Sequence, residues 1–200
     1  MTTPPGNNGM ATKKQRALLK EARTQAYKHG LNRLSLQTVA RNTGISKRTL
    51  YRYYRNREAF LAAVMDFDGA AWCEWFFDAI REQADMPAQR LYAFFETLAL
   101  WEQSDDFRGC LFACALFNAE LMTDEPAAVA RHYAERIRAF ISENMRRAGI
   151  TDPDDVAETL LLPTLAVLSG TRPRVNKHTG HHLLTLATAL LDRHLTAENK

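Results

Sequence analysis

Apolar residues recur at helical spacing over almost the whole chain, and this pattern limits the fold more than any other sequence feature. Near the N-terminus, Leu18, Leu19, Ala22 and Ala26 lie along one helical face, and comparable patterns continue toward the C-terminus. No stretch has the sustained apolar–polar alternation of a half-buried strand. With 200 residues, 46% of them hydrophobic, the chain can bury a sizeable core. The sequence therefore predicts an all-α globular protein with about nine helices.

Capping residues and a glycine define three short helices near the N-terminus. Thr12 and Gln15 have the spacing of a capping box, and Gly30 stands where the first helix should end. Ser35 is expected to cap a second helix and Ser46 a third. Between these two helices the sequence Thr-Gly-Ile allows only a tight turn. Two helices joined in this way are the layout of a helix-turn-helix.

The remaining helices are predicted from proline, asparagine and aspartate at their starts and glycine at their ends. Pro163 should kink its helix without ending it, because the apolar pattern continues beyond it. We expect helices over residues 56–83 and 87–103, from Asp105 and Asp106 through Leu111 to Leu121, from Pro126 to Gly149, from Asp152 and Pro153 to Gly170, and over residues 179–195.

The net charge of +3 is the sum of two opposite parts. Residues 1–60 carry 13 Lys or Arg against two acids, a balance of +11, so that residues 61–200 carry 13 basic and 21 acidic residues, a balance of −8. A small basic unit joined to a larger acidic one suggests a polyanionic partner for the first. A membrane is not expected as a partner, because no apolar run is long enough to cross one.

The expected third helix carries side chains suited to DNA on one face. Leu50 and Tyr54 should pack inward, whereas the other face bears cations and hydroxyl groups with no acid between Arg33 and Arg57. Lysine and arginine can bind base edges in the major groove, and hydroxyls and helix N-termini suit phosphates. The alternative to DNA binding is that this third helix is basic only because it lies on the solvated surface. We predict base-edge contacts by Lys47, Arg48, Thr49 and Arg52, and phosphate contacts by Ser35, Thr38, Ser46, Tyr51, Tyr53 and Arg57.

The segment from Leu18 to Phe60 resembles the N-terminal DNA-binding domain of TetR/AcrR-type transcriptional regulators. The resemblance rests on Gly30, Val39-Ala40, the Gly44–Ser46 turn, Thr49–Tyr51, Tyr53-Tyr54 and Arg57-Glu58. The sequence departs from the family pattern at Gln25-Ala26, where Leu-Phe is usual, and at Arg48, where glycine is common. The resemblance implies a homodimeric repressor that binds a double-stranded DNA operator and is released by a small-molecule effector. A cytoplasmic location is expected separately, because the three cysteines form no even framework and the N-terminal residues have no apolar stretch typical of a signal peptide.

We accordingly expect a disordered tail over residues 1–11, the helix-turn-helix unit over 12–58 and a helical ligand-binding and dimerisation unit over 59–200.

Eleven of the 19 aromatic residues lie between Trp72 and Phe117, as would suit a largely apolar cavity between helices. Ordinary core packing remains the alternative for each of them. The predicted pocket walls are Trp75, Phe94, Phe95, Leu98, Trp101, Phe112 and Phe117.

The last two expected helices are apolar on more than one side. A helix of this kind needs two surfaces to pack against, so one side can cover the core and the other can pair with a second copy of the chain. Complete burial within one subunit is the alternative. The predicted dimer contacts are Leu160, Thr164, Val167, Leu183, Leu186 and Leu190.

No catalytic, cofactor or metal site is expected. Cys110 and Cys114 are interpreted as buried core thiols, and the histidines between 178 and 182 lack a nearby cysteine or carboxylate ligand. No nucleophile-elbow, P-loop or dinucleotide motif is present. Two other functions stay open: an activator of the same fold, and a small helical ligand carrier or enzyme with an accessory basic domain.

Overall fold

A computed structural model describes residues 12–118, 121, 123–170 and 178–197. The described residues form nine α-helices and a short 3-10 helix and contain no strand, so the predicted all-α class is confirmed. The tail expected over residues 1–11 lies outside this part of the chain. The helices are α1 (Lys13–His29), η1 (Leu31–Arg33), α2 (Leu36–Thr43), α3 (Lys47–Tyr53), α4 (Arg57–Gln83), α5 (Pro87–Gln103), α6 (Leu111–Leu116), α7 (Asp124–Arg147), α8 (Pro153–Leu168) and α9 (Thr179–Ala197).

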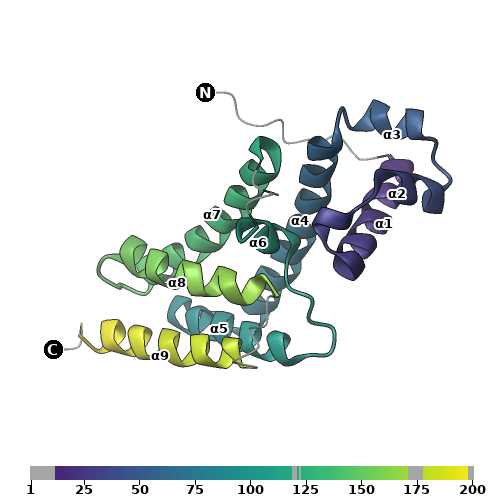
Figure 1. Cartoon of the computed structure of the whole chain (residues 1–200). Coiled ribbons are helices and arrows are strands. Elements are labelled where there is room, and N and C mark those ends of the chain that lie inside the picture. The colour runs from purple at the N-terminus through teal and green to yellow at the C-terminus, as the bar shows by residue number, and fades with distance from the viewer. Residues whose placement is uncertain (1–11, 119–120, 122, 171–177, 198–200) are drawn as a thin grey trace.

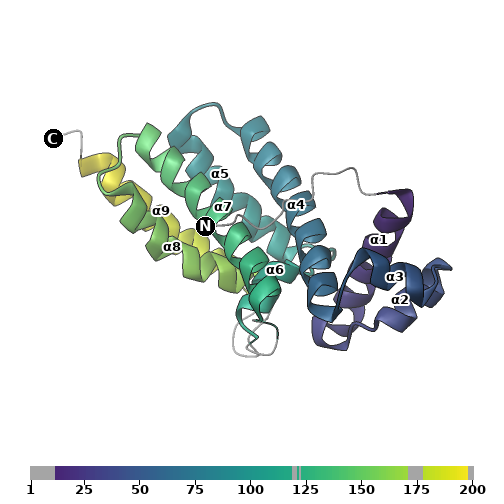
Figure 2. The same cartoon turned by 90° about the horizontal axis from the view of Figure 1, so that it is seen from above.

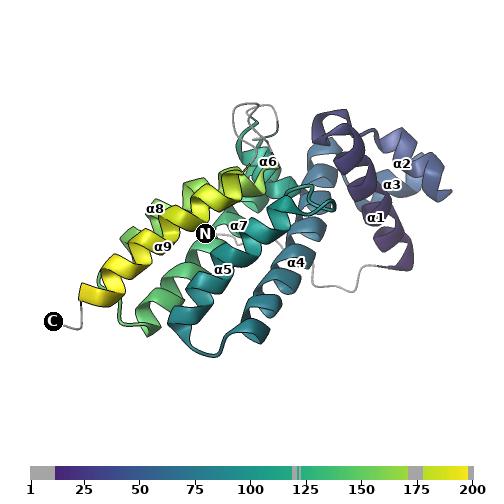
Figure 3. The ribbon, with the colours of Figure 1, turned by 90° about the horizontal axis from the view of Figure 1, so that it is seen from below.

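Helix α4, the longest of them, lies between the N-terminal helices and the rest of the molecule (Figure 1). Helices α1, α2 and α3 gather at one end of the molecule, and α8 and α9 lie at the opposite end, as views from both sides show (Figures 2 and 3). Helix α4 contacts α1 and also α5, α6 and α7. It therefore joins the N-terminal helices to the helical body without an intervening linker.

The predicted caps of the first helices are confirmed. Thr12 and Gln15 form a reciprocal capping box at the start of α1. The hydroxyl of Ser35 accepts a hydrogen bond from the backbone N–H of Thr38, and Asn56 caps α4 through the N–H of Ala59 at 2.8 Å. Each cap satisfies a backbone donor that the helix itself leaves unpaired. These local bonds explain why the boundaries could be read from sequence.

The connection after α5 differs from the prediction. A helix was expected from Asp105 and Asp106 through to Leu121, but α6 covers only Leu111–Leu116. Gly109 has a φ of +73°, which a right-handed helix cannot contain. The N–H of Cys110 then donates to the carbonyl of Leu168 at 2.6 Å. The backbone at this point is paired with the end of α8 and is not available for a helix.

Two further helix predictions hold. Helix α8 continues through Pro163, as the apolar pattern indicates, and α7 ends two residues before Gly149, which has a φ of +84°. No helix in the described part of the chain is both long and apolar enough to span a bilayer.

Candidate nucleic-acid interface and the cavities of the helical body

Helices α2 and α3 are held at a fixed angle by a left-handed turn. Gly44 has a φ of +65° and a ψ of +17°, a conformation that glycine adopts without a steric cost. The N–H of Ile45 closes the turn on the carbonyl of Ala40 at 3.0 Å. Val39 of α2 and Leu50 of α3 are fully buried. The turn and this apolar contact together leave the opposite face of α3 toward solvent.

The residues predicted to bind base edges lie together on α3. Lys47, Arg48 and Arg52 are exposed, and Thr49 is half-buried. The hydroxyls of Thr49 and Ser46 are 3.0 Å apart, while Ser46 also accepts from the N–H of Thr49. The first turn of α3 is therefore fixed by its cap, and three cations project from a short rigid helix.

The predicted phosphate contacts surround this helix. Ser35, Ser46 and Tyr51 are exposed, and Thr38 and Tyr53 are half-buried. Arg57 is exposed too, but its guanidinium donates to the carbonyl of Asn32 at 2.9 Å. Arg57 thus binds the start of α4 to η1 and also adds positive charge to the surface around α3.

A buried carboxylate that the sequence reading missed connects α1, α4 and α6. Asp68 of α4 is completely buried and accepts from Arg23 Nε at 2.6 Å and from the backbone N–H of Leu111 at 2.9 Å. The hydroxyl of Tyr27 lies 2.8 and 2.9 Å from the two carboxylate oxygens and 3.0 Å from the carbonyl of Gly109. We call Asp68, Arg23, Tyr27, Gly109 and Leu111 the Asp68 cluster.

Opposing influences act on the charge of Asp68. Burial raises the pKa of this carboxyl above its usual range, while the Leu111 N–H, Arg23 and Tyr27 act to lower the pKa. Burial and the nearby Asp68 raise the pKa of the Tyr27 hydroxyl, so that Tyr27 remains a hydrogen-bond donor. The sequence signal for this cluster was that Asp68, unlike the neighbouring Asp66, falls on the same helical face as Val64, Met65 and Trp72, because a buried acid requires partners.

The residues predicted to form a ligand pocket are divided between a solid core and a cavity. Phe94, Phe95, Leu98 and Phe112 are at most 1% exposed and form part of the hydrophobic core. Phe117 is exposed at the end of α6. Only two of the predicted residues, Trp75 and Trp101, line the cavity described next.

This cavity has a volume of about 550 Å³ and lies between α1 and the helical body. We call it the tryptophan cavity, because Trp72, Trp75 and Trp101 form its walls. Its other lining residues come from α1, from α4 and from the connection between α5 and α6, and they are Lys20, Arg23, Thr24, Tyr27, Ala71, Asp106, Arg108 and Gly109.

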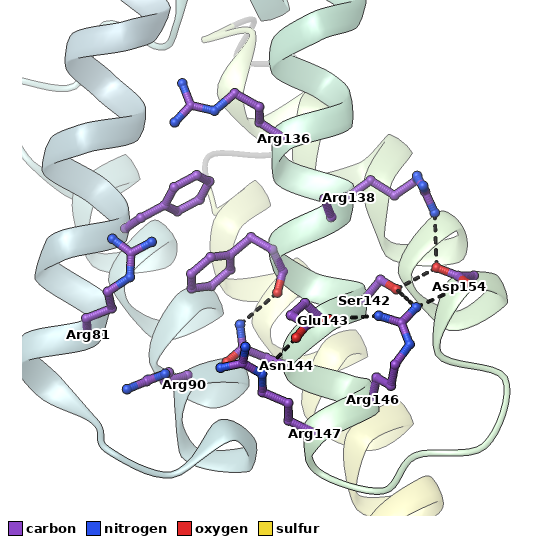
Figure 4. Close-up of a pocket in the computed structure, with 13 residues that line it drawn as sticks. Arg81, Arg90, Arg136, Arg138, Ser142, Glu143, Asn144, Arg146, Arg147 and Asp154 are labelled. Carbon is purple, nitrogen blue, oxygen red and sulfur yellow. Dashed lines mark hydrogen bonds and ion pairs between the residues drawn. The ribbon is translucent and has the colours of Figure 1, made fainter.

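A second hollow of about 710 Å³ is rich in arginine (Figure 4). We call it the arginine depression; α4, α5, α7 and the start of α8 form it. Several of its guanidinium groups are already paired: Arg138 with Glu135 and Asp154, Arg146 with Glu143 and Asp154, and Arg147 with Glu143. Its charge is therefore partly neutralised by acids of the same region.

Most of the residues predicted to form a dimer contact are inside the monomer. Leu160, Thr164, Val167 and Leu183 are at most 4% exposed, because α8 and α9 pack with their small and branched side chains toward the body. Leu190 is half-buried. Leu186 of α9 and Leu162 of α8 are the large apolar residues left exposed in these helices, at 46% and 65%.

The cysteines also differ in part from the prediction. Cys110 is buried as expected, but Cys114 is exposed, since it lies on the outer side of the short helix α6. Within the described ranges, no group of three or more His, Cys, Asp or Glu side chains is arranged to hold a metal ion.

The N-terminal helices match a known family of regulators. Residues 18–64 match the family model of bacterial regulatory proteins of the tetR family. No curated protein matches the chain.

Solved structures share the architecture of about nine-tenths of the chain. A putative TetR-type transcriptional regulator from Streptomyces avermitilis is 25% identical, with a TM-score of 0.74 over 90% of this chain and 97% of its own. A TetR-family regulator from Streptomyces coelicolor is 15% identical, with a TM-score of 0.76 over 91% and 96%. AibR, solved with isovaleryl coenzyme A and operator DNA, is 21% identical, with a TM-score of 0.61 over 90% and 97%.

Proposed function

We propose, from the premise that this chain is a TetR-type transcriptional regulator, that it acts as a homodimeric repressor in the cytoplasm. Two copies bind a palindromic operator, and a small, largely apolar or aromatic effector releases them. In this proposal the helix-turn-helix unit spans residues 12–58, and residues 59–200 carry effector binding and dimerisation. AibR has been solved with both an acyl coenzyme A and operator DNA, which supports a regulator that responds to a small molecule.

The main support for DNA binding is the exposed cationic face of α3. Lys47, Arg48 and Arg52 project from a helix whose apolar side is fixed by Leu50. A helix of this width enters the major groove, where lysine and arginine bind guanine O6 and N7. Ser35 and Ser46, with the N-terminal ends of α2 and α3, bind the phosphates on either side.

Dimerisation involves α8 and α9, which lie side by side at the end opposite α3 (Figure 3). Leu162 and Leu186 supply apolar surface there, and a self-complementary contact of two helices from each copy gives a two-fold dimer. The dimer places two α3 helices roughly 34–36 Å apart, which is one helical turn of DNA.

The Asp68 cluster links effector binding to DNA binding. Arg23 and Tyr27 belong to α1 of the DNA-binding unit, whereas Asp68 and Leu111 belong to the helical body. An effector that favours another arrangement of α4 and α6 must change these contacts. DNA affinity then falls by the ratio of effector affinities in the two arrangements.

Selection of binding sites from random DNA duplexes tests the proposal. We expect a palindromic motif, and we expect Lys47→Ala combined with Arg48→Ala to weaken binding to it by at least about 30-fold, since each good base contact supplies about 1–3 kcal/mol of discrimination. Arg146→Ala combined with Arg147→Ala is the matched control, because it removes the same charge from the arginine depression. The control should change affinity by less than about threefold, since salt screens charges far from the DNA.

Two results would contradict the proposal. Recovery of a motif without two-fold symmetry would exclude the dimeric arrangement on DNA. Equal weakening by the α3 pair and by the control pair would mean that α3 does not read the sequence.

A further inference from the structure

All three tryptophans of the chain meet at one cavity, the tryptophan cavity defined above. Trp75 and Trp101 are in edge contact with ring centroids 5.5 Å apart, and Trp72 lies 6.2 Å from Trp101. Trp75 is 48% exposed, although an indole of this size is usually covered in a folded protein. These rings offer an incompletely covered aromatic surface to a flat ligand.

The cavity also carries an excess of positive charge. Lys20 and Arg23 line it from α1 and Arg108 lines it from the connection after α5, against one lining acid, Asp106. Arg23 uses its Nε to bind Asp68, and 40% of its side chain remains exposed. Basic groups beside an aromatic wall favour a ligand that is both flat and negatively charged.

One polar group in the wall of the tryptophan cavity is an unpartnered donor. The indole N–H of Trp72 is buried and has no hydrogen-bond partner within the described part of the chain, while Trp72 itself is 5% exposed. An indole N–H can only donate, and leaving it unpaired in the interior has a free-energy cost. Because solvent does not reach this nitrogen, a ligand in the cavity could accept from it only after the Trp72 ring or its neighbours moved.

We infer that the tryptophan cavity binds a small aromatic carboxylate, with its ring against Trp75 and Trp101 and its carboxylate toward Lys20, Arg23 and Arg108. The volume of about 550 Å³ lies within the range of roughly 300–1,000 Å³ for small-molecule sites. The inference rests on the proposed effector-controlled function and modifies it in two ways: the effector carries a negative charge, and Lys20 and Arg23 of α1 join residues of the helical body in binding it.

Binding at this site acts directly on the Asp68 cluster. Arg23, Tyr27 and Gly109 belong to that cluster and also line the tryptophan cavity. A ligand carboxylate near Arg23 competes with Asp68 for the same guanidinium. Occupancy therefore weakens the attachment of α1 to α4, which is one of the contacts that orient the DNA-binding helices.

Tryptophan fluorescence of the full-length protein tests the inference, since every tryptophan in the chain lines the cavity. The probes are 3-phenylpropanoate, 3-phenylpropanamide and 3-phenylpropylamine, which share a ring and differ in charge. We expect saturable quenching by the carboxylate with a Kd of about 1 mM or below. The amide and the amine should bind at least about tenfold more weakly.

Two variants of equal charge change separate this cavity from general surface charge. Lys20→Gln combined with Arg108→Gln should weaken carboxylate binding at least about tenfold, to the level expected for the amide. Arg146→Gln combined with Arg147→Gln, in the arginine depression, should leave carboxylate binding unchanged. Lys20 and Arg108 are exposed, so neither change opens the core, and far-UV circular dichroism verifies folding.

The inference is overturned if the three probes bind equally, if none quenches up to about 10 mM, or if the control pair weakens the carboxylate as much as the cavity pair does. DNA binding is measured on the same preparation. Operator binding without any preference for the carboxylate refutes the inference alone, whereas failure to select any DNA motif refutes the proposed function and leaves the fluorescence result to decide the cavity.

Discussion

Replacement of Asp68 by asparagine is the most informative single change in this protein. The carboxylate is fully buried and accepts hydrogen bonds from Arg23, Tyr27 and the backbone of Leu111. Asparagine has the same shape, but its amide nitrogen presents hydrogens where two of these partners also present hydrogens. The change therefore removes the charge and part of the hydrogen bonding without making a cavity.

The expected cost in the free energy of unfolding is about 2–3 kcal/mol. A hydrogen bond to a charged group contributes about 1.5–3 kcal/mol, and breaking a fully buried ion pair costs about 3–5 kcal/mol. The cost for Asp68→Asn is nearer the value for a hydrogen bond to a charged group, because 40% of the Arg23 side chain is exposed. Water can therefore solvate the Arg23 guanidinium once its ion pair is lost. In a chain of this size, such a cost lowers Tm by about 4–12 °C.

Asp78→Asn is the matched control on the same helix. Asp78 pairs with Arg81 at 2.7 Å, but 58% of its side chain is exposed, so its loss should cost at most about 0.5 kcal/mol. Urea unfolding followed by circular dichroism measures both variants. Equal destabilisation by Asp68→Asn and Asp78→Asn would refute the reasoning, because it would mean that burial and the shared partners of Asp68 contribute nothing.

Two further predictions concern Gly109 and the thiols. Gly109→Ala should cost more than about 2 kcal/mol, because a Cβ would lie 2.6 Å from the Gly170 nitrogen and the Leu168 carbonyl oxygen. Gly44→Ala, also at positive φ but with no atom within 4 Å of the added Cβ, should cost only about 1 kcal/mol. Urea unfolding measures the free energy of unfolding of both variants. Equal costs would contradict the argument that close contacts around Gly109 add to the cost of its positive φ. Among the cysteines, Cys114 should react first with a disulfide reagent at about pH 8, because it is exposed whereas Cys73 and Cys110 are buried. Burial raises the pKa of all three thiols, that of Cys73 to about 11 and that of Cys110 well above its usual value. A Cys114→Ser protein that still shows a fast-reacting thiol would contradict this order.

The sequence alone was sufficient for the features that depend on neighbouring residues. The caps at Thr12, Ser35 and Asn56 involve partners three residues away, and the turn at Gly44 needs only one residue with positive φ. The all-α class follows from helical periodicity in the same way. Because these contacts are local, they can be read without knowing where the rest of the chain lies.

Features that depend on contacts between distant segments were decided by the tertiary structure. The sequence could not predict that the N–H of Cys110 would pair with Leu168 and shorten α6. Nor could it tell which of the clustered aromatic residues would be core: Phe94 and Phe112 are fully buried, whereas Trp75 remains half exposed at a cavity. Helical periodicity identifies an apolar face, but the packing partner of that face depends on the whole fold.

The charge pattern is a feature that the sequence determines, and the Asp68 cluster is one that only the tertiary structure determines. The sequence by itself determined that a basic helix-turn-helix precedes an acidic helical body, because charge and capping residues are counted along the chain. Only the tertiary structure joined Asp68 to Arg23 and Tyr27, which lie 45 and 41 residues away. A buried acid requires partners, but the identity of those partners is settled by how α1 packs against α4.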